Sequence, residues 1–503
     1  MLTVIEHVLD EMHRMEIRYC HWKSNVRVAQ SVLGQTDMDI LVDTQQRMLF
    51  HELLCRHGFK KVRSPLWQSY PGIEDYLGFD TVTGGQTHFH VHYTLILGEP
   101  MLKSYHFPWE ERLLADRVFD KSNRIYTSAP YWEILLLLVR WSLKLDGRDR
   151  ASPSLRKQKR WASYFEEYDW LRERVDPAHV ASLAQELLGS EVAMLVTGML
   201  QQDPSPASLA QLRRLLYSSF ATYARLTPFE RWYQKTVRSV VRRVARSRFG
   251  RYGRIPLKKT LPTTGCIVAI VGIDGSGKST LVAELTRWLA WKMETHALYL
   301  GHGAGQGSWL TERLKQLLRR GGISRKVQAP TTPTTEVSAN QNQAKGTLKQ
   351  AIRAILHALL ALSIAHDRLR RIRWAEQLRR KGAVVITDRW VQKQPYRMDC
   401  PMLPPLMERH AWLKRLGKWM VRYEQHLYER MAQCAPDLVI RLNITPEKAV
   451  ARKEDLDLAT AQFKANILHS LEFAGNPCIV DIDAEQPFEK VLLEVKRALW
   501  QHL

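Results

Sequence analysis

Apolar positions follow two spacings along this chain, and each spacing favours one kind of element. Short apolar runs bounded by turn residues favour buried strands, and apolar residues at three- and four-residue intervals favour helices. In residues 1–120 the two patterns mix, which predicts an α+β domain. The expected elements are helices at 3–15 and 45–57, strands at 39–42 and 86–97, and a hairpin turn at Gly84-Gly85.

Residues 121–230 are predicted to form a helical extension of that domain. Proline-bearing turns at Asp176-Pro177 and at Asp203-Pro204-Ser205-Pro206 separate its helices. We expect a basic linker after the extension, at 231–262. Apolar residues recur at helical intervals in three segments of the extension, 132–145, 160–174 and 180–188.

Strand and helix patterns alternate again in residues 263–503. This alternation predicts an α/β domain in which helices cover both faces of a parallel sheet. A polar, proline-bearing segment at about 324–346 interrupts the pattern and is expected to be a mobile insertion. The predicted strands are 266–271, 297–300, 383–387, 438–442 and 478–481.

The chain is ordinary in apolar content but strongly basic. With 503 residues, of which 45% are hydrophobic, it is expected to hold several domains with apolar cores. The net charge of +23 is concentrated, because Arg213–Lys259 holds 14 lysines and arginines but one acid, Glu230. A second basic run spans Arg368–Arg373. Such runs attract anionic membrane surfaces, nucleic acid or acidic substrates, or they form a solvated linker and a solvated helix face.

Cysteine spacing and the first residues bear on localisation. The six cysteines have neither zinc-binding nor CxxC spacing, so we expect free thiols and a reducing compartment. The chain begins without the basic and apolar regions of a signal peptide, and its apolar runs are too short to cross a bilayer. We expect a cytoplasmic protein, with Arg213–Lys259 as a candidate for peripheral contact with the inner membrane surface.

A glycine-rich loop stands between a predicted buried strand and a predicted helix, at Gly272-Ile273-Asp274-Gly275-Ser276-Gly277-Lys278-Ser279-Thr280. This is the context of a phosphate-binding loop, in which backbone N–H groups and a helix N-terminus surround phosphate oxygens. Lys278 is expected to reach the β- and γ-phosphates of ATP, and the Ser279 hydroxyl is expected to hold Mg²⁺. The candidate nucleotide-binding residues are Gly272, Asp274, Gly275, Ser276, Gly277, Lys278, Ser279 and Thr280.

A second constellation follows another apolar strand, at Asp388-Arg389. In a parallel sheet the carboxyl ends of the strands share one edge, so we expect Asp388 beside the glycine-rich loop. Its predicted role is to orient Mg²⁺, directly or through water, and Arg389 is predicted to bind an acceptor phosphate. The alternative is that Asp388 caps the next element.

The motifs of this half together resemble the thymidylate kinase family. They are the loop Gly272–Thr280, Asp388-Arg389-Trp390, and Pro436-Asp437-Leu438-Val439-Ile440 followed by Thr445-Pro446-Glu447. The resemblance covers about residues 263–500 and implies a P-loop NTPase fold that transfers the γ-phosphoryl group of ATP. It also implies that Asp274 contacts an acceptor sugar hydroxyl and that Arg389 binds the acceptor phosphate. Arg452 and Lys453 would clamp the moving phosphoryl group, unless they form an exposed helix end.

Two segments depart from the pattern of that family. Tyr299–Gly305 lacks the arginine of the family's second-strand motif, and Val391–Arg397 replaces the segment that reads the acceptor base. The lid is also short and lacks an arginine-rich repeat. We therefore expect an ATP-dependent phosphotransferase of divergent, thymidylate kinase-like type. Its acceptor would be a nucleotide monophosphate or a related small phosphorylated molecule.

The N-terminal part holds a pair of carboxylates, Asp37 and Asp39, at the start of an apolar strand. Residues two apart on a strand face the same side, so this pair is a candidate site for Mg²⁺. Together with Trp22-Lys23-Ser24-Asn25, the segment Gly34–Val42 resembles the minimal nucleotidyltransferase fold of the polymerase-β type. The resemblance covers about residues 1–120, with the helices to 230 as a customary partner.

That family carries a third carboxylate on a neighbouring strand, where this chain has His90. Four hypotheses remain open for the N-terminal domain. It is a degenerate nucleotide-binding or partner-binding module, an active transferase with histidine-assisted metal binding, or a polar sheet face without a ligand. In the fourth, His88, His90 and His92 form a different metal site with Asp37 and Asp39.

Three functions are consistent with these features. The first is the phosphotransferase described above. The second is a bifunctional enzyme in which the N-terminal domain transfers a nucleotidyl group to a sugar, a protein or a nucleic acid. The third is an ATP-dependent switch or scaffold that docks on a membrane or on nucleic acid through Arg213–Lys259. Aromatic residues in that stretch favour the apolar face of a helix pair over a nucleic-acid platform.

Overall fold

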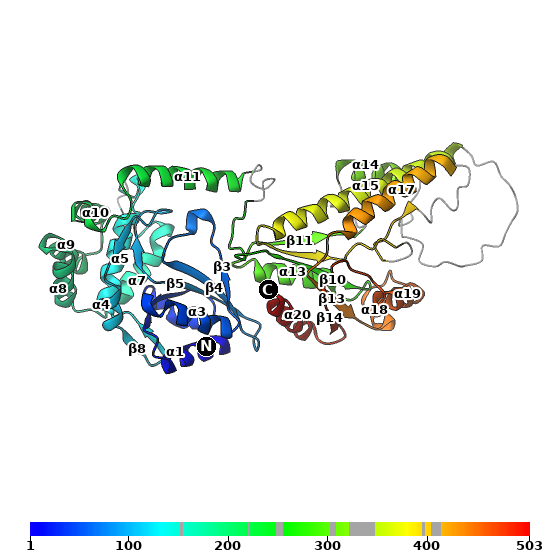
Figure 1. Cartoon of the computed structure of the whole chain (residues 1–503). Coiled ribbons are helices and arrows are strands. Elements are labelled where there is room, and N and C mark those ends of the chain that lie inside the picture. Colours follow the sequence, from blue (N-terminus) through cyan, green and yellow to red (C-terminus); the bar gives the residue numbers. More distant parts are fainter. Residues whose placement is uncertain are drawn as a thin grey trace. The chain divides into compact units, whose positions relative to one another are not determined.

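The computed structural model describes residues 1–150, 154–219, 221–247, 255–301, 308–320, 348–394, 398–403 and 414–503. The chain divides into two compact units, Met1–Lys259 and Thr260–Leu503 (Figure 1). The segment expected to be a mobile insertion, at about 324–346, lies outside the described residues. The finer division at 120 and 230 stays a prediction.

The first unit is built around a mixed sheet. Among the described residues, seven strands have the order β3-β4-β5-β2-β1-β9-β8. β2 pairs in parallel with β5, and β1 in parallel with β9, whereas the other neighbours are antiparallel. The strands are β1 (Tyr19–His21), β2 (Met38–Val42), β3 (Lys60–Val62), β4 (Ile73–Phe79), β5 (Gln86–His92), β8 (Val118–Asp120) and β9 (Ile125–Thr127); a separate pair is β6 (Leu95–Leu97) and β7 (Tyr105–Phe107).

Alternation along β5 decides which face of this sheet is apolar. Phe89 and Val91 are buried in a core with residues of the helices α1 (Thr3–Arg14) and α3 (Arg47–Arg56). Since side chains alternate along a strand, His88, His90 and His92 lie on the opposite face. The hairpin predicted at Gly84-Gly85 is confirmed, because β4 and β5 are antiparallel neighbours. The strand predicted at 86–97 is instead two strands, β5 and β6, in different sheets.

Helices complete the first unit, and each of the predicted helical segments 132–145, 160–174 and 180–188 holds a helix, whereas Ile125–Thr127 of the expected helical extension form strand β9. The centre of this extension is α5, whose twelve residues from Trp132 to Leu143 are buried. A large second core joins it to the helices that follow. The α-helices are α1 (Thr3–Arg14), α2 (Val28–Val32), α3 (Arg47–Arg56), α4 (Glu110–Ala115), α5 (Pro130–Lys144), α6 (Gly147–Arg150), α7 (Ala162–Arg172), α8 (Pro177–Leu188), α9 (Ser190–Gln201), α10 (Pro206–Ser219) and α11 (Pro228–Arg246). Short 3₁₀ helices are η1 (Asn25–Arg27), η2 (Thr44–Gln46), η3 (Leu66–Gln68), η4 (Lys159–Trp161) and η5 (Ala221–Tyr223).

The prediction of a basic linker at 231–262 is wrong for the first half of that range, because helix α11 occupies it. A capping box starts this helix: the Thr227 hydroxyl accepts from the Glu230 backbone N–H, and the Glu230 carboxylate accepts from the Thr227 N–H. These bonds satisfy backbone donors that a helix start leaves free. The density of arginines concealed a helical pattern that the cap makes stable.

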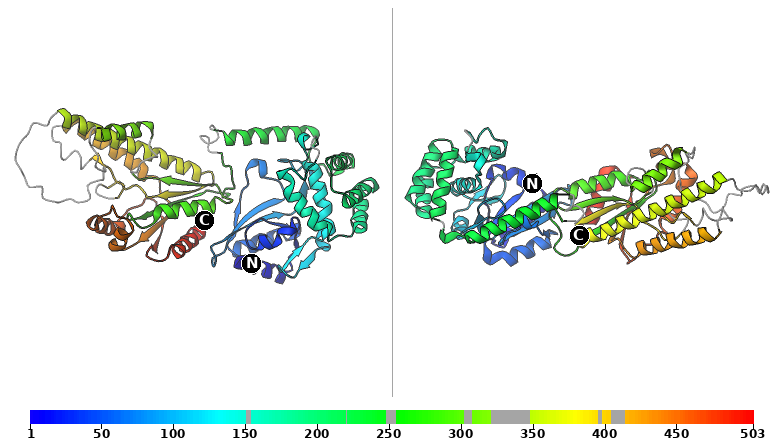
Figure 2. Two further views of the ribbon diagram at one scale, coloured as in Figure 1. Left: turned by 180° about the vertical axis from the view of Figure 1, so that it is seen from behind. Right: turned by 90° about the horizontal axis from the view of Figure 1, so that it is seen from above.

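The second unit contains a fully parallel sheet, as predicted. In the part described, its strand order is β11-β12-β10-β13-β14, and all five predicted strands are present. Figure 1 shows α15 and α17 on one face and α13 and α20 on the other, and Figure 2 gives the same arrangement from behind and above. The elements are β10 (Cys266–Gly272), α13 (Lys278–Leu289), β11 (Thr295–Tyr299), α14 (Trp309–Arg320), α15 (Leu348–Arg379), β12 (Val384–Asp388), α17 (Lys414–Ala432), β13 (Leu438–Asn443), α18 (Pro446–Arg452), α19 (Leu458–Leu468), β14 (Cys478–Asp483) and α20 (Phe488–His502).

Two further expectations concern cysteines and membranes. All six cysteines are free thiols, as predicted from their spacing. In the described segments, no helix combines the length and the apolar character that crossing a membrane requires.

Candidate functional site

The glycine-rich loop joins β10 to α13, and its glycines are needed for its shape. Gly275 and Gly277 have φ angles of +88° and +85°, a region that favours glycine. A Cβ atom on Gly275 would lie 2.5 Å from the carbonyl oxygen of Ala449, and one on Gly272 would lie 2.7 Å from Ser276 Oγ. The backbone therefore turns tightly at the N-terminus of α13, where N–H groups are free to bind an anion.

Lys278 is the first residue of α13 and is buried against the loop. Its Nζ donates to the carbonyl oxygen of Ile273 at 2.7 Å and to Ser276 Oγ at 3.4 Å. Burial, reinforced by the positive charge of Arg389, lowers the pKa of the Lys278 ammonium to about 8, although Asp274 opposes the shift. An anionic phosphate in the loop would supply the negative charge that this ammonium lacks.

Ser279 and Asp388 meet at the carboxyl edge of the sheet. β12 pairs with β10 in a register that sets Asp388 beside Ile270. The Ser279 hydroxyl donates to Asp388 Oδ2 at 2.7 Å. The other oxygen, Asp388 Oδ1, is buried and has no hydrogen-bond partner among the described residues. A serine hydroxyl and a carboxylate oxygen of this kind are ligands that Mg²⁺ prefers.

Arg389 and Asp274 form a charged cluster next to this pair. Arg389 has a φ angle of +75°, and its guanidinium lies 2.6 Å from Asp274 Oδ1. Lys464 of α19 lies 2.6 Å from the other oxygen, Asp274 Oδ2. Burial would raise the pKa of the Asp274 carboxyl, but Arg389, Lys464 and Lys278 together hold it well below its usual value. Two cations on one carboxylate leave the cluster able to receive another anion.

Arg452 and Lys453 lie at the C-terminal end of α18. Arg452 donates to the carbonyl oxygen of Ala484 at 3.0 Å and lines a small pocket whose other walls include Ser276, Gly277, Leu281 and Phe488. Lys453 is exposed, 3.9 Å from Asp455. Arg452 thus lies next to Gly277 of the glycine-rich loop. Thr280, the last residue of the loop motif, is exposed in the first turn of α13.

Three contributors to this site carry no motif and were missed: Lys464, Arg368 and Asp399. Arg368 is 1% exposed and donates to the carbonyl oxygen of Leu300 at 2.7 Å and to Asp399 Oδ1 at 2.9 Å. Asp399 Oδ2 in turn lies 3.5 Å from Arg389. The basic run at 368–373 is therefore not one solvated face, because its first member is a buried support for Arg389.

Replacing Arg368 with methionine should lower the free energy of unfolding by about 3–5 kcal/mol, because it removes the closer of the two cations that pair with the buried Asp399 carboxylate. Urea denaturation of the full chain measures this change. Arg370→Met, at an exposed position of the same helix, is the control and should stay within about 0.5 kcal/mol of the parent. Equal losses in the two variants would contradict this description of Arg368.

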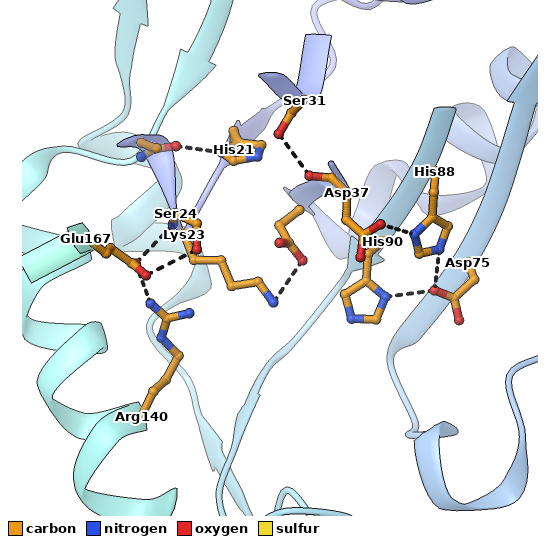
Figure 3. Close-up of polar contacts among 12 residues, drawn as sticks. His21, Lys23, Ser24, Ser31, Asp37, Asp75, His88, His90, Arg140 and Glu167 are labelled. Atoms are coloured by element: carbon orange, nitrogen blue, oxygen red, sulfur yellow. Dashed lines mark hydrogen bonds and ion pairs between the residues drawn. The ribbon is translucent and has the colours of Figure 1, made fainter. Parts of the chain in front are cut away.

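The N-terminal carboxylates face the histidines of β5, as their spacing predicts. Asp39 lies opposite His90 in the parallel pair β2–β5, and its Oδ1 is 2.8 Å from Lys23 Nζ. Asp37 Oδ1 accepts from His88 Nδ1 at 2.9 Å (Figure 3). The two carboxylates therefore share a face, but each has a different partner.

Asp75 on β4 is a third carboxylate that was not predicted. Its Oδ1 lies 3.0 Å from His88 Nε2 and 2.8 Å from His90 Nδ1 (Figure 3). Burial would raise its pKa, but the bonds from His88 and His90 and the charge of Lys259 hold the pKa well below its usual value. Alternation along β4 gave no signal for Asp75, because its neighbours on the same face, Ile73 and Leu77, are apolar.

The polar groups of this face form two clusters with metal-binding potential. Asp39, His90 and His92 offer ligand atoms that all lie within 4.8 Å of one another, and so do Asp75, His88 and His90. Asp37 belongs to neither cluster among the described residues. A Mg²⁺ ion shared by Asp37 and Asp39 stays a prediction.

A buried polar network supports the loop that follows β1. Ser24, with a φ angle of +57°, donates its backbone N–H to Glu167 Oε1 at 3.0 Å, and Arg140 donates to the same oxygen at 2.7 Å. Asn25 donates to Glu133 Oε1 at 2.8 Å. Burial, with the nearby Glu167 charge, raises the pKa of Glu133 to about 8. These bonds hold Lys23 where it meets Asp39.

Comparisons with known proteins give a coarse description. No protein-family model matches the chain. The uncharacterized ATP-binding protein YghR of Escherichia coli (strain K12) is 28% identical over 236 residues, which are 46% of this chain and 86% of that protein. The uncharacterized ATP-binding protein YghS of the same strain is 33% identical over 236 residues, which are 46% of this chain and 92% of that protein. Both names state ATP binding, and neither states a reaction.

Proposed function

Because the chain belongs to the same family as the uncharacterized ATP-binding protein YghS, we propose that its unit Thr260–Leu503 is an ATP-dependent kinase. It transfers the γ-phosphoryl group of ATP to a nucleotide monophosphate or a related small phosphorylated acceptor. The resemblance to thymidylate kinases supports the reaction type. The departures at Tyr299–Gly305 and Val391–Arg397 support a different acceptor pocket.

The observation that carries this proposal is the meeting of Ser279 with Asp388. A buried carboxylate oxygen without a partner sits beside a hydroxyl at the edge of a phosphate-binding loop. Ser279 and Asp388 would hold Mg²⁺, directly or through water, and the ion would neutralise charge on the phosphates when bound. Lys278 would donate to the β- and γ-phosphate oxygens instead of to the loop carbonyl. Catalysis would be positional and electrostatic.

The cations around Asp274 define where the acceptor binds. Arg389 and Lys464 both contact this carboxylate and lie at its two oxygens, so an acceptor phosphate can bind the cations while Asp274 accepts from a hydroxyl. Arg368, through Asp399, fixes the Arg389 guanidinium. The pocket with Arg452 and Phe488 suits a planar base, since a guanidinium stacks on such a ring. Arg452 would then bind the nucleoside end of ATP rather than the moving phosphoryl group.

A transfer screen tests the proposal. The full chain is incubated with radiolabelled ATP, Mg²⁺ and panels of nucleoside monophosphates and sugar phosphates, and labelled products are separated by chromatography. We expect one acceptor class to gain label in the parent and lose it in Arg389→Met. Free ATP hydrolysis without any labelled acceptor would favour an ATP-dependent switch instead.

ATP affinity should fall as the pH rises above about 8. The Lys278 ammonium has a pKa of about 8 in the free protein, and bound phosphate raises it, so binding takes up a proton above that pH. The dissociation constant then rises by up to about tenfold per pH unit, whereas below pH 8 this group is charged in both states. Displacement of a fluorescent ATP analogue measures the effect. Lys278→Arg stays charged throughout, and an equal slope in that variant would refute the assignment.

Nucleotidyl transfer by the first unit has less support. That reaction needs two metal ions held by several carboxylates, and Asp37 lies outside both ligand clusters of the described residues. We therefore propose that residues 1–120 share the fold of the minimal nucleotidyltransferases but not their reaction. The histidines beside Asp39 and Asp75 favour a ligand other than a pair of Mg²⁺ ions.

A further inference from the structure

A cluster of three side chains that could bind a metal lies on the polar face of the sheet of the first unit. It is far from the glycine-rich loop in sequence. Asp39 of β2 and His90 and His92 of β5 bring a carboxylate and two imidazoles within 4.8 Å of one another. His92 is 0% exposed, and neither of its ring nitrogens has a hydrogen-bond partner among the described residues. Burying two polar atoms without partners is costly, so such a side chain points to an absent ligand.

His90 is oriented as a metal ligand would be. Its Nδ1 is held by Asp75 Oδ1 at 2.8 Å, which leaves Nε2 for the cluster with Asp39 and His92. Asp75 is itself fixed, because Ser64 donates to its other oxygen at 2.7 Å and His88 contacts Oδ1. A carboxylate behind an imidazole sets its tautomer and direction, and this pairing accompanies most metal-bound histidines.

We propose that Asp39, His90 and His92 bind a divalent first-row transition-metal ion such as Zn²⁺. Two imidazoles and one carboxylate suit such an ion, whereas Mg²⁺ prefers an octahedron of oxygen ligands. Three protein ligands leave further positions open for water or for an anionic ligand. The inference is independent of the kinase proposal, because its residues all belong to Met1–Lys259.

Lys23 supplies an internal test. Its ammonium lies 2.8 Å from Asp39 Oδ1 and over the Trp22 ring, at 5.1 Å from the ring centroid. It therefore competes for the carboxylate with any bound cation, and its charge repels one. Removing this charge should tighten metal binding, an effect opposite to that of ligand loss.

Titration of the metal-free full chain with Co²⁺, in the absence of nucleotide, tests the site. The intensity of visible absorption reports the coordination geometry of bound Co²⁺, and competition with Zn²⁺ gives the affinity. We expect one ion per chain, an affinity at least about 100-fold lower in His92→Ala and about 10- to 100-fold lower in Asp75→Asn. Lys23→Met should bind more tightly than the parent.

The matched control is His7→Ala, which removes an exposed histidine of α1 and should change nothing. Circular dichroism without metal establishes that each variant folds. Should His92→Ala not fold, Lys23→Met still decides, because unchanged or weaker Co²⁺ binding in that variant overturns the proposal. Equal spectra in the parent and in a folded His92→Ala variant would also overturn it, as would a preference for Mg²⁺ over Zn²⁺.

Helix α11 carries a second, independent feature: an apolar stripe that faces solvent. Phe229, Trp232 and Tyr233 are 70%, 63% and 55% exposed, and Val240 and Val244 continue the stripe at helical spacing. The opposite side faces the body of its unit, where Arg238 donates to the carbonyl oxygen of Met101 at 2.8 Å and Ala245 is buried. Exposed apolar stripes of this extent mark an interaction surface.

Exposed cations beside the apolar stripe indicate that its partner is anionic. On a helical wheel, Lys235 and Arg246 lie along one flank of the stripe and Arg243 lies within it, next to Trp232; all three are exposed. We propose that this face of α11 lies on an anionic bilayer, with its aromatic rings at the headgroup level and its flanking cations beside the lipid phosphates. Aromatic and basic residues combine in this way on helices that lie in the interface plane.

Vesicle sedimentation of the full chain tests this surface. Phosphatidylcholine vesicles with phosphatidylglycerol should sediment the parent, and vesicles without it should sediment less. Phe229→Ser with Trp232→Ser should reduce binding at least about tenfold. Met194→Ser, at an equally exposed methionine of α9, is the control. Absent sedimentation, an equal loss in the control, or light scattering that shows a dimer lost in the double variant would overturn the proposal. Binding of single-stranded nucleic acid in place of vesicles would also overturn it.

Discussion

Replacing Lys278 with methionine should lower the rate of ATP turnover by about 10³-fold or more. The ammonium is buried at the loop and has a carbonyl and a hydroxyl as its neighbours in the described structure. Bound phosphates would replace these neighbours, and the charge would act where negative charge shifts during transfer. Single cations in such positions contribute about 10³-fold or more to phosphoryl transfer. Coupled-enzyme detection of ADP measures the rate.

The control for this prediction is Lys490→Met on the exposed surface of α20. It removes the same charge from the same unit and should leave the rate within about twofold of the parent. Both variants should unfold at similar denaturant concentrations. A Lys278→Met protein that turns over ATP at the parent rate would remove the loop from the mechanism.

Replacing Asp388 with asparagine should also lower turnover, by about 10²- to 10³-fold, and should raise the Mg²⁺ concentration needed for half-maximal rate. The carboxylate provides a buried, unpaired oxygen beside the Ser279 hydroxyl. An amide keeps the size of the side chain but binds a hard cation weakly. Turnover measured against Mg²⁺ concentration separates the metal effect from a loss of ATP binding.

Asp483→Asn is the matched control for Asp388, because it changes an exposed aspartate at the end of β14 in the same sheet. Its rate and its Mg²⁺ dependence should match those of the parent. If the Asp388→Asn protein shows the parent's Mg²⁺ dependence, Asp388 caps an element and does not orient the metal.

The elements that position the loop could be predicted because their patterns are local. Each of the five strands of the second unit is an apolar run bounded by turns, and parallel topology alone predicts that Asp388 meets Ser279. The shared face of Asp37 and Asp39 was predictable for the same reason, because residues two apart on a strand point to the same side. The two carboxylates share a face in the structure. Their partners His88 and His90 belong to β5, a strand that follows later in the chain.

The residues that were missed depend on contacts between distant segments. Lys464 reaches Asp274 across 190 positions, and Arg368 reaches Asp399 from a run that looked uniformly basic. No motif marks either residue, and net charge alone does not distinguish a buried guanidinium from a solvated one. The segment of helix α11 was assigned to a linker because of its charge, although its aromatic residues already favoured the apolar face of a helix pair.

Calorimetric titration of the full chain with ATP, with and without Mg²⁺, tests most directly whether residues 272–280 and 388–389 form one triphosphate site. We predict a single site that binds more tightly with Mg²⁺. In Lys278→Met the heat should be lost, and in Asp388→Asn the benefit of Mg²⁺ should disappear. Heat that persists unchanged in both variants, or no heat in the parent, would contradict a shared triphosphate site.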